Sequence, residues 1–294
     1  MTAAVFAFSE DRLAAKRLAD ALGVGLQPID LHTLPDGESL PSVRGAMETV
    51  LLYRSLDRPD AKLMPLLLAC DALRRAGARR VVLVAPYLPY LRQDAVFKPG
   101  QPLSRDVIGA LLGPRFERIV TVEPHLHRTA DLVPVFAGTP VTALSAAGPL
   151  AARIGATERP VIVGPDEESR PWVTRIAQAL GASHLVLRKQ RHGDREVELE
   201  MPPGACVAGR RVVIVDDICS TGGTVIGAVR RLGVADAASI EVAVVHALFK
   251  PGVDATLRRM GVRSVISTDA CPHPSNRIPV AGLLADALFQ ELSL

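Results

Sequence analysis

The sequence predicts an α/β fold in two halves, each with a mostly parallel central sheet flanked by helices. The chain has 294 residues, which is more than one hydrophobic core usually fills and suggests two domains of roughly 150 residues each. Short runs rich in valine and isoleucine alternate with segments of helical period, as in proteins built from strand–helix–strand units. The same order of elements recurs in the two halves, which indicates a duplicated architecture.

Composition and charge exclude several classes of protein. Apolar residues make up 48% and charged residues 22%, as in ordinary globular domains, so intrinsic disorder is excluded. The net charge of +3 is too small to indicate nucleic-acid or membrane binding, and the aromatic content of 4% argues against a base-stacking surface. No apolar stretch approaches about 18 residues, and the 4 cysteines include no CxxC pair. We therefore expect a cytoplasmic protein with free thiols and with neither a membrane nor a nucleic-acid partner.

The elements of the first half follow from the spacing of its apolar residues. A helix is expected from Asp11 to Leu22, with Ser9 as its N-cap. A second helix is expected from Ala61 to Ala76, because its leucines share one face and Gly77 follows as a typical helix end. Continuous apolar runs, which are typical of strands covered on both faces, predict strands at residues 80–85 and 118–122.

The second half starts after a stretch of small residues at 145–148. We expect an N-terminal domain of residues 1–147 and a C-terminal domain of residues 148–294. Apolar runs predict strands in the second domain at residues 161–164, 212–215 and 242–245. The last segment, 280–294, has the pattern of an amphipathic helix and is a candidate for packing on the N-terminal domain.

The run Val212–Thr224 carries the strongest chemical signal. A buried strand ends in two carboxylates, Asp216 and Asp217, and a turn of small residues then leads into a helix. Open α/β sheets bind ligands at this edge, and alternation along a strand sends the two carboxylates to opposite sides. The glycines allow the backbone to close around a phosphate, which N–H groups and hydroxyls can bind. The run lacks a Walker A sequence, and the alternative interpretation is a plain strand end followed by an N-cap.

This run resembles the 5-phosphoribosyl-1-diphosphate (PRPP) binding signature of type I phosphoribosyltransferases and of ribose-phosphate diphosphokinases, the PRPP synthetases. Three further segments resemble regions that only the synthetases possess: Leu34–Glu38, Pro86–Asp94 and Phe97–Ser104. The likeness covers nearly the whole chain. The loop Phe97–Ser104 and Ser220 resemble archaeal-type synthetases more than the common bacterial kind. The resemblance implies two tandem phosphoribosyltransferase-like domains.

The resemblance also implies an activity and its binding residues. Synthetases transfer the diphosphoryl group of MgATP to the C1 hydroxyl of ribose 5-phosphate, which gives PRPP and AMP. The residues assigned to ribose 5-phosphate are Asp216, Asp217, Ser220, Thr221, Gly222, Gly223 and Thr224. Those assigned to ATP are Asp36, Glu38, Arg92, Gln93 and Asp94. A guanidinium suits polyphosphate, and carboxylates accept hydrogen bonds from adenine or ribose. By itself the 92–94 segment would be weak evidence, because a charged loop after a strand is usually a solvated turn.

A metal and a catalytic loop complete the implied site. The resemblance implies Mg²⁺ with His125 and Asp166 as ligands, and charge repulsion between a triphosphate and a sugar phosphate gives the metal a physical reason. His127 makes a His-x-His pair with His125, for which a soft-metal site and simple loop capping are alternatives. Lys189 and Arg191 match the Lys-x-Arg of the family's catalytic loop, in which the cations stabilise the transition state. A solvated basic hairpin is the alternative there.

Two segments depart from the family pattern. Gly164–Arg170 carries Glu167 and Glu168 where synthetases have a glycine pair, and Val122–His125 has glutamate and proline in place of aspartate and leucine. Carboxylates beside an anion are unfavourable unless a metal or Arg170 neutralises them.

Three functions stay open on these grounds. They are a PRPP synthetase, a diphosphokinase with a different phosphosugar acceptor, and a non-catalytic regulator associated with synthetases. Because the family forms symmetric oligomers, the resemblance also implies a homo-oligomer, a dimer or higher, with Phe97 and the loop 98–100 as candidate contacts.

Overall fold

The computed structural model describes residues 3–126, 131–192 and 196–293, without the side chains of residues 191, 192 and 196–198. The chain divides into two compact units. Unit 1 comprises Met1–Ser145, Ala270–Pro272 and Pro279–Leu294, and unit 2 comprises Ala146–Asp269 and His273–Ile278. The last segment of the chain therefore belongs to unit 1, together with the N-terminal half.

Unit 1 contains a seven-stranded sheet in the order β3-β2-β1-β4-β5-β6-β7. All neighbouring pairs are parallel except β2 and β3, which form an antiparallel hairpin. The strands are β1 (Ala3–Phe8), β2 (Gly25–Thr33), β3 (Ser39–Ser42), β4 (Thr49–Tyr53), β5 (Arg80–Val84), β6 (Arg118–Val122) and β7 (Val141–Leu144). β1, β4, β5 and β6 are almost wholly buried, as their continuous apolar sequences require.

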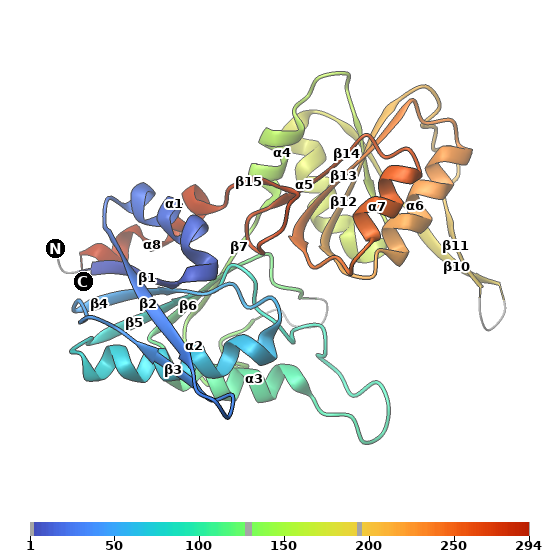
Figure 1. Ribbon diagram of the computed structural model, residues 1–294. Coiled ribbons are helices and arrows are strands. Elements are labelled where there is room, and N and C mark those ends of the chain that lie inside the picture. The colour runs from blue at the N-terminus through green and yellow to red at the C-terminus, as the bar shows by residue number, and fades with distance from the viewer. Residues whose placement is uncertain (1–2, 127–130, 193–195, 294) are drawn as a thin grey trace. The chain divides into compact units, whose positions relative to one another are not determined.

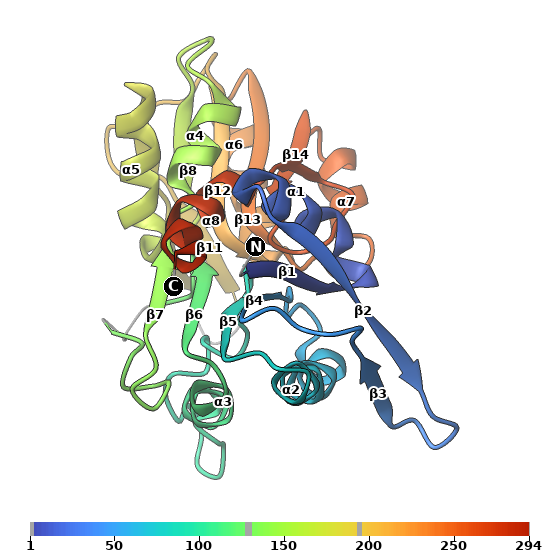
Figure 2. The ribbon, with the colours of Figure 1, turned by 90° about the vertical axis from the view of Figure 1, so that its left-hand side faces the viewer.

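Helices cover both faces of the unit 1 sheet. In both views α1 and α8 lie on one face, and α2 and α3 lie on the other (Figures 1 and 2). The helices are α1 (Arg12–Leu22), α2 (Pro59–Arg75), α3 (Ser104–Leu112) and α8 (Ala281–Leu288), with short 3-10 turns at Ser9–Asp11, Gly113–Arg115 and Phe289–Leu292. Proline at the first position of α2 suits a helix start, and Gly77 follows its end with a left-handed φ of 110°.

Two details differ from the sequence-based expectations for these helices. Ser9 does not cap α1, because it begins a 3-10 turn whose last residue, Asp11, directs its carboxylate to the buried Arg54. The final helix is shorter than 280–294, since α8 ends at Leu288 and a 3-10 turn follows. That turn is fixed by Glu291, which accepts hydrogen bonds from Arg80 and Arg118.

Unit 2 contains a six-stranded parallel sheet in the order β15-β14-β13-β12-β8-β9 and a separate antiparallel hairpin of β10 and β11. The sheet strands are β8 (Val161–Gly164), β9 (Ser183–Val186), β12 (Arg211–Cys219), β13 (Ser239–Ala247), β14 (Ser264–Thr268) and β15 (Asn276–Ile278). The hairpin strands are β10 (Arg188–His192) and β11 (Glu196–Glu200). The prediction of two α/β halves with mostly parallel sheets is confirmed.

Helices also cover both faces of the unit 2 sheet. α4 and α5 lie on one face, and α6 and α7 lie on the other (Figure 1). Their bounds are α4 (Ala147–Ile154), α5 (Arg170–Leu180), α6 (Gly223–Val234) and α7 (Val253–Arg259), with a 3-10 turn at Glu167–Ser169. The apolar face of α6 packs on the central strands through Val225, Val229 and Leu232.

Each sheet has one point where the strand order reverses. In unit 1 the chain runs outward from β1 to β2 on one side and from β4 to β7 on the other, so the reversal lies between β1 and β4. In unit 2 the corresponding reversal lies between β8 and β12. The carboxyl edge of the strands at such a point is where open α/β sheets bind ligands.

Candidate active site

The end of β12 delivers the predicted carboxylates to the reversal point of unit 2. The strand runs on to Cys219, beyond the predicted 212–215, and stays paired with β13 past Asp216. The turn of residues 220–222 follows, and α6 begins at Gly223. The predicted strand, small-residue turn and helix are therefore consecutive in the structure, with the carboxylates at the strand end.

Gly222 is required by the shape of this turn. Its φ of 76° is left-handed, and an added Cβ would lie 2.6 Å from Cγ1 of Val253. The backbone N–H of Gly223 points at the hydroxyl of Thr221, 3.5 Å away, and the carbonyl of Ser220 accepts the N–H of Lys250 at 2.9 Å. The Gly223 N–H and the Thr221 hydroxyl thus lie at the start of α6, and groups of both kinds can bind phosphate.

Three carboxylates lie close enough to influence one another at this edge. Burial raises the pKa of Asp216 well above its ordinary value, and the charges of Asp217 and Asp166 raise it further. Asp166 follows β8, on the other side of the reversal point. Such a cluster is electrostatically unfavourable by itself, and a bound cation or hydroxyl donors would relieve it.

Lys189 joins this cluster. Its Nζ donates to Oδ2 of Asp166 at 2.7 Å, and its side chain is 46% exposed. Lys189 lies on β10, opposite Leu199 of β11, in the hairpin that continues to Arg191. The side chain of Arg191 lies outside the described residues. The structure thus brings together the predicted catalytic lysine and one predicted metal ligand.

Part of the negative charge of Glu167 and Glu168, which replace the family's glycine pair, is neutralised within the chain. Arg170 donates to both carboxylate oxygens of Glu167 at 2.7 Å, and Arg188 lies 3.6 Å away. The hydrogen bonds from Arg170 lower the pKa of Glu167 below its ordinary value, although burial opposes them. Arg170 therefore acts on Glu167 as the sequence argument required.

The predicted ATP residues occupy two separate places in unit 1. Asp36 and Glu38 form the exposed turn of the β2–β3 hairpin, where the Glu38 N–H donates to Oδ1 of Asp36 at 3.2 Å. Arg92 and Gln93 are exposed in the loop after β5, and Asp94 is partly buried there. Two strands, β1 and β4, separate β2 from β5 in the sheet, which corresponds to roughly 14 Å across the strands.

His125 follows β6 in unit 1 and is partly buried. Glu123, which precedes it, has a left-handed φ of 40° and accepts a hydrogen bond from Ser145 at 3.1 Å. His127 lies outside the described residues. The predicted metal ligands His125 and Asp166 belong to different units. Within the described ranges, no group of three metal-ligating side chains is assembled.

The reversal point of unit 1 holds a buried charge cluster that the sequence analysis did not anticipate. Arg54 follows β4, is 1% exposed and donates to Asp11 at 2.9 Å and to Glu10 at 3.1 Å. Lys62, which is 2% exposed, donates to Asp57 at 2.6 Å. The signal for this cluster is weak in a sequence, because a charged residue just after a strand usually belongs to a solvated turn.

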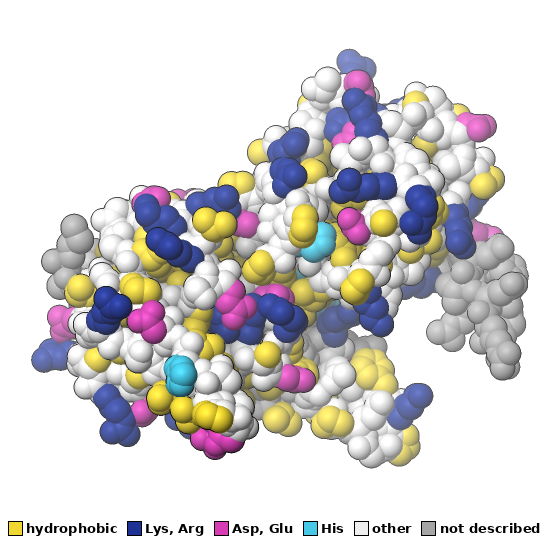
Figure 3. All heavy atoms as spheres, in the orientation of Figure 1, with side chains coloured by type: hydrophobic (Ala, Val, Ile, Leu, Met, Phe, Trp, Pro, Cys, Tyr) yellow, Lys and Arg dark blue, Asp and Glu magenta, His cyan; other side chains and the backbone are white. Residues whose placement is uncertain are grey.

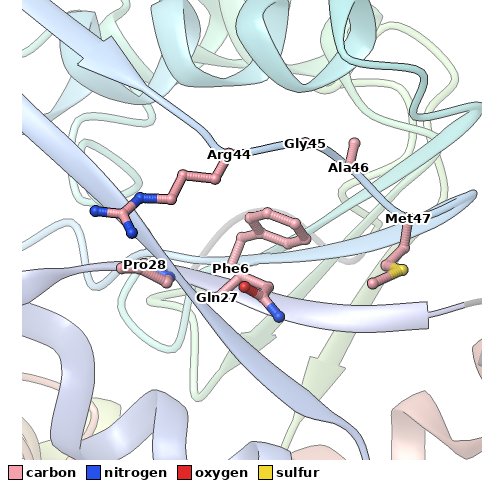
Figure 4. Close-up of a pocket in the computed structure, with 7 residues that line it drawn as sticks. All are labelled: Phe6, Gln27, Pro28, Arg44, Gly45, Ala46 and Met47. Carbon is pink, nitrogen blue, oxygen red and sulfur yellow. The ribbon is translucent and has the colours of Figure 1, made fainter.

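Surface features outside these positions have no evident link to the predicted site. A cavity of about 230 Å³ beside β1 and β2 is lined by Phe6, Gln27, Pro28, Arg44, Gly45, Ala46 and Met47, none of which is a predicted site residue (Figure 4). On the face drawn in Figure 3, basic and acidic side chains are interspersed. In the described parts of the chain, every helix is too short or too polar to cross a bilayer.

Comparisons with known proteins cover the full chain. Residues 3–113 match the N-terminal domain of ribose phosphate pyrophosphokinase, and residues 143–276 match the phosphoribosyl transferase domain. The ribose-phosphate pyrophosphokinase of Methanopyrus kandleri is 33% identical over 286 residues, 97% of this chain and 98% of that protein. The Halobacterium salinarum enzyme of the same name is 34% identical over 286 residues, 95% of this chain and 98% of that protein.

A solved structure agrees with these sequence matches. The crystal structure of phosphoribosylpyrophosphate synthetase from Mycobacterium smegmatis matches with a TM-score of 0.84 and 27% identity, covering 100% of this chain and 99% of that one. The archaeal sources of both sequence relatives agree with the archaeal-type resemblance. The expected two-domain fold and the expected family are confirmed, and the chain belongs to the ribose-phosphate pyrophosphokinase family.

Proposed function

We propose that this ribose-phosphate diphosphokinase transfers the β,γ-diphosphoryl group of MgATP to the C1 hydroxyl of ribose 5-phosphate, at the carboxyl edge of the unit 2 sheet. The supporting observation is the joint placement of Asp216, Asp217, the 220–224 turn and the Lys189–Asp166 pair at the reversal point between β8 and β12. A phosphate cradle, sugar-hydroxyl acceptors and a cation that can reach the transferring group are the parts that this reaction requires.

The 220–224 turn is the proposed seat of the sugar phosphate. The hydroxyls of Ser220, Thr221 and Thr224 and the N–H groups at the start of α6 would donate to its oxygens. Asp216 and Asp217 would accept hydrogen bonds from ribose hydroxyls, which would partly offset the burial and the neighbouring negative charges that raise the pKa of Asp216. This arrangement would direct the C1 hydroxyl outward from the strand edge.

Lys189 and Arg191 are the proposed catalytic residues. In the transfer, the C1 oxygen forms a bond to the β-phosphorus, the bond from that phosphorus to the α,β-bridging oxygen breaks, AMP leaves and the C1 hydroxyl proton is released. Negative charge spreads over the transferring oxygens, and cations placed on them stabilise the transition state. The 46% exposure of Lys189 supports this role, because its ammonium can exchange Asp166 for a phosphoryl oxygen without unfolding the hairpin.

Asp36, Glu38, Arg92, Gln93 and Asp94 are the proposed ATP residues. The exposed guanidinium of Arg92 suits the polyphosphate, and the carboxylates at the hairpin turn suit adenine or ribose donors. Asp36 and Glu38 extend from the sheet on a hairpin whose β2 pairs with β1 only as far as Ile29.

We also expect a homo-oligomer, a dimer or higher, and the exposed Phe97 supports a contact with another copy.

Mg²⁺ fits the donor set of the proposed site. Proteins hold Mg²⁺ through one or two carboxylates together with substrate phosphates, and the carboxylate of Asp166 lies at the edge where the phosphates would bind. Asp166 and His125 are the proposed ligands. When bound, the ion would neutralise the polyphosphate and polarise its oxygens.

Cytoplasmic location is likewise a proposal, supported by four free thiols.

An acceptor panel tests this function. Purified protein is incubated with MgATP and with ribose 5-phosphate or other phosphosugars, and AMP release and product are measured. We expect AMP and PRPP in equal amounts, with ribose 5-phosphate as the best acceptor. A better alternative acceptor would show a diphosphokinase with a different substrate. ADP as the sole nucleotide product, or no turnover with any acceptor, would overturn the proposal.

A further inference from the structure

The loop after β5 carries three proposed nucleotide residues, Arg92, Gln93 and Asp94, in irregular backbone. This loop, 85–103, joins β5 to α3 and contains the exposed Arg92 and Gln93. Leu88 and Leu91 are 3% and 2% exposed and anchor it in the core of unit 1. Buried leucines fix where a loop lies, whereas the direction of an exposed polar side chain depends on its hydrogen bonds.

Tyr90 provides the first polar tie of this loop. Its φ of 64° is left-handed, a conformation that is uncommon and unfavourable for an aromatic residue. Its hydroxyl donates to the carboxylate of Asp60 in the first turn of α2, and this hydrogen bond raises the pKa of Tyr90 above its ordinary value. The carbonyl of Tyr90 accepts the N–H of Gln93 at 3.1 Å. The bond to Asp60 therefore stabilises a turn that leads directly to Gln93.

Ser104 provides the second tie. It is the first residue of α3, and its hydroxyl donates to Oε1 of Gln93, while the Arg105 N–H donates to the Gln93 carbonyl at 3.3 Å. A glutamine amide offers one acceptor oxygen and two N–H donors. Because the Ser104 hydroxyl donates to the oxygen of Gln93, both N–H groups on Nε2 stay available as donors to a ligand. Phosphate oxygens and the ring nitrogens N1, N3 and N7 of adenine are acceptors, so this orientation matches ATP.

We propose that Tyr90 and Ser104 are positioning residues for diphosphoryl transfer, which hold Gln93 with its amide N–H groups directed to the nucleotide. The proposal rests on the proposed function, because it takes Gln93 as an ATP residue. The loop is bonded to the first turns of both α2 and α3. The bond from Tyr90 to Asp60 would fix the turn at Tyr90, and the bond from Ser104 would independently fix the amide of Gln93.

The Tyr90 contact is tested by a double-mutant cycle. Tyr90→Phe and Asp60→Ala should each raise the KM for ATP about 3- to 10-fold, which corresponds to one lost hydrogen bond, with kcat and the KM for ribose 5-phosphate within about twofold. The double variant should be no worse than the poorer single variant, because both substitutions remove the same bond. Additive losses, or equal rises in KM for both substrates, would overturn the role of Tyr90.

The Ser104 contact is tested by a conservative pair. Ser104→Ala should raise the KM for ATP about 3- to 10-fold, whereas Ser104→Thr keeps the hydroxyl and should restore it. Thermal unfolding of each variant separates positioning from misfolding. If wild-type protein makes PRPP but Ser104→Ala leaves the KM for ATP unchanged, the positioning role is wrong and the function stands. If titration shows that wild-type protein does not bind ATP, both proposals fail.

Discussion

The two units place charged residues at the same point of the same sheet architecture and use them in opposite ways. In unit 1 the edge between β1 and β4 is closed by Arg54, Lys62 and their carboxylate partners, all within hydrogen-bond distance. In unit 2 the edge between β8 and β12 holds carboxylates that repel one another and a lysine that is half exposed. In the first set each cation is paired with a carboxylate, although Nε of Arg54 is buried without a hydrogen-bond partner, whereas the second set contains more carboxylates than cations among the described side chains.

Further contacts hold the buried charged residues of unit 1 in place. The Arg54 guanidinium lies 4.2 Å from the ring centroid of Phe8, and the Ser55 hydroxyl donates to the carbonyl of Ala270 at 2.6 Å. Burial raises the pKa of Asp11 even though Arg54 opposes this shift. The comparison shows that the same point of the fold can carry paired charges in one unit and mutually repelling carboxylates in the other. A matched set can replace a ligand within the fold.

Arg54→Met should produce the largest change, a loss of about 3–5 kcal/mol in the free energy of unfolding. The substitution leaves the carboxylate of Asp11 buried without its cation. Denaturant unfolding measures the effect. The matched control is Arg44→Met, whose exposed pair with Asp30 at 3.7 Å should contribute less than about 1 kcal/mol. Equal losses for the two variants would show that the unit 1 cluster does not stabilise the fold.

Lys189→Ala should lower activity and leave stability nearly unchanged, in contrast to the expected loss of stability in Arg54→Met. We expect kcat to fall about 100- to 1,000-fold because a cation on the transferring oxygens is lost, with little change in the unfolding midpoint. Steady-state kinetics and thermal unfolding of the same sample measure both quantities. A loss of stability with unchanged kcat would show that Lys189, like Lys62, stabilises the fold and does not take part in catalysis.

Gly222→Ala should impair the unit 2 edge by a smaller amount. The left-handed φ and the 2.6 Å approach to Val253 predict a loss of about 1–3 kcal/mol in stability and a higher KM for ribose 5-phosphate. Gly148→Ala is the control, because Gly148 lies in α4 with no heavy atom within 4 Å of an added Cβ. That substitution should be neutral or slightly stabilising. If Gly222→Ala binds ribose 5-phosphate normally, the turn is not the phosphate seat.

Asp216→Asn should give the smallest effect, and a gain in stability. The pKa of Asp216 is higher in the folded state than in the unfolded state, where it is near 3.8. The protonated carboxyl therefore stabilises the fold fully below the unfolded-state pKa, and this stabilisation is lost as the pH rises through the folded-state pKa. The neutral asparagine avoids this loss. We expect the unfolding midpoint of the ligand-free variant to exceed that of wild type by a few degrees at neutral pH and to match it below about pH 4. A lower midpoint at neutral pH would contradict the unfavourable burial and charge repulsion of the ionised Asp216.

Much of this architecture was predictable, because apolar runs mark buried strands directly. The predicted strand at 80–85 is β5, and the predicted Ala61–Ala76 helix is α2 with shifted ends. β12 is longer than predicted because its polar end still pairs with β13. β10 has no apolar residue to mark it as a strand, and the alternation in β11 spans only Glu196–Glu200, so neither strand of this hairpin was predicted from the sequence. In the described residues its two strands pair with each other and not with the larger sheet.

The candidate site was predictable where consecutive residues form it and unpredictable where the fold joins residues that are distant in sequence. The run from Asp216 to Thr224 is a local strand, turn and helix, so its pattern is visible in sequence. The bond between Tyr90 and Asp60 spans 30 residues, and the bond between Arg54 and Asp11 spans 43. Such pairs depend on sheet order, which local spacing does not determine.

The fate of the β-phosphorus of ATP tests the central claim most directly. ATP carrying a label at that position is incubated with the protein, magnesium and ribose 5-phosphate, and the labelled product is identified. If the unit 2 edge transfers the diphosphoryl group intact, the label appears in PRPP and the AMP formed is unlabelled. Label recovered in ADP, or retained in ATP, would contradict the account.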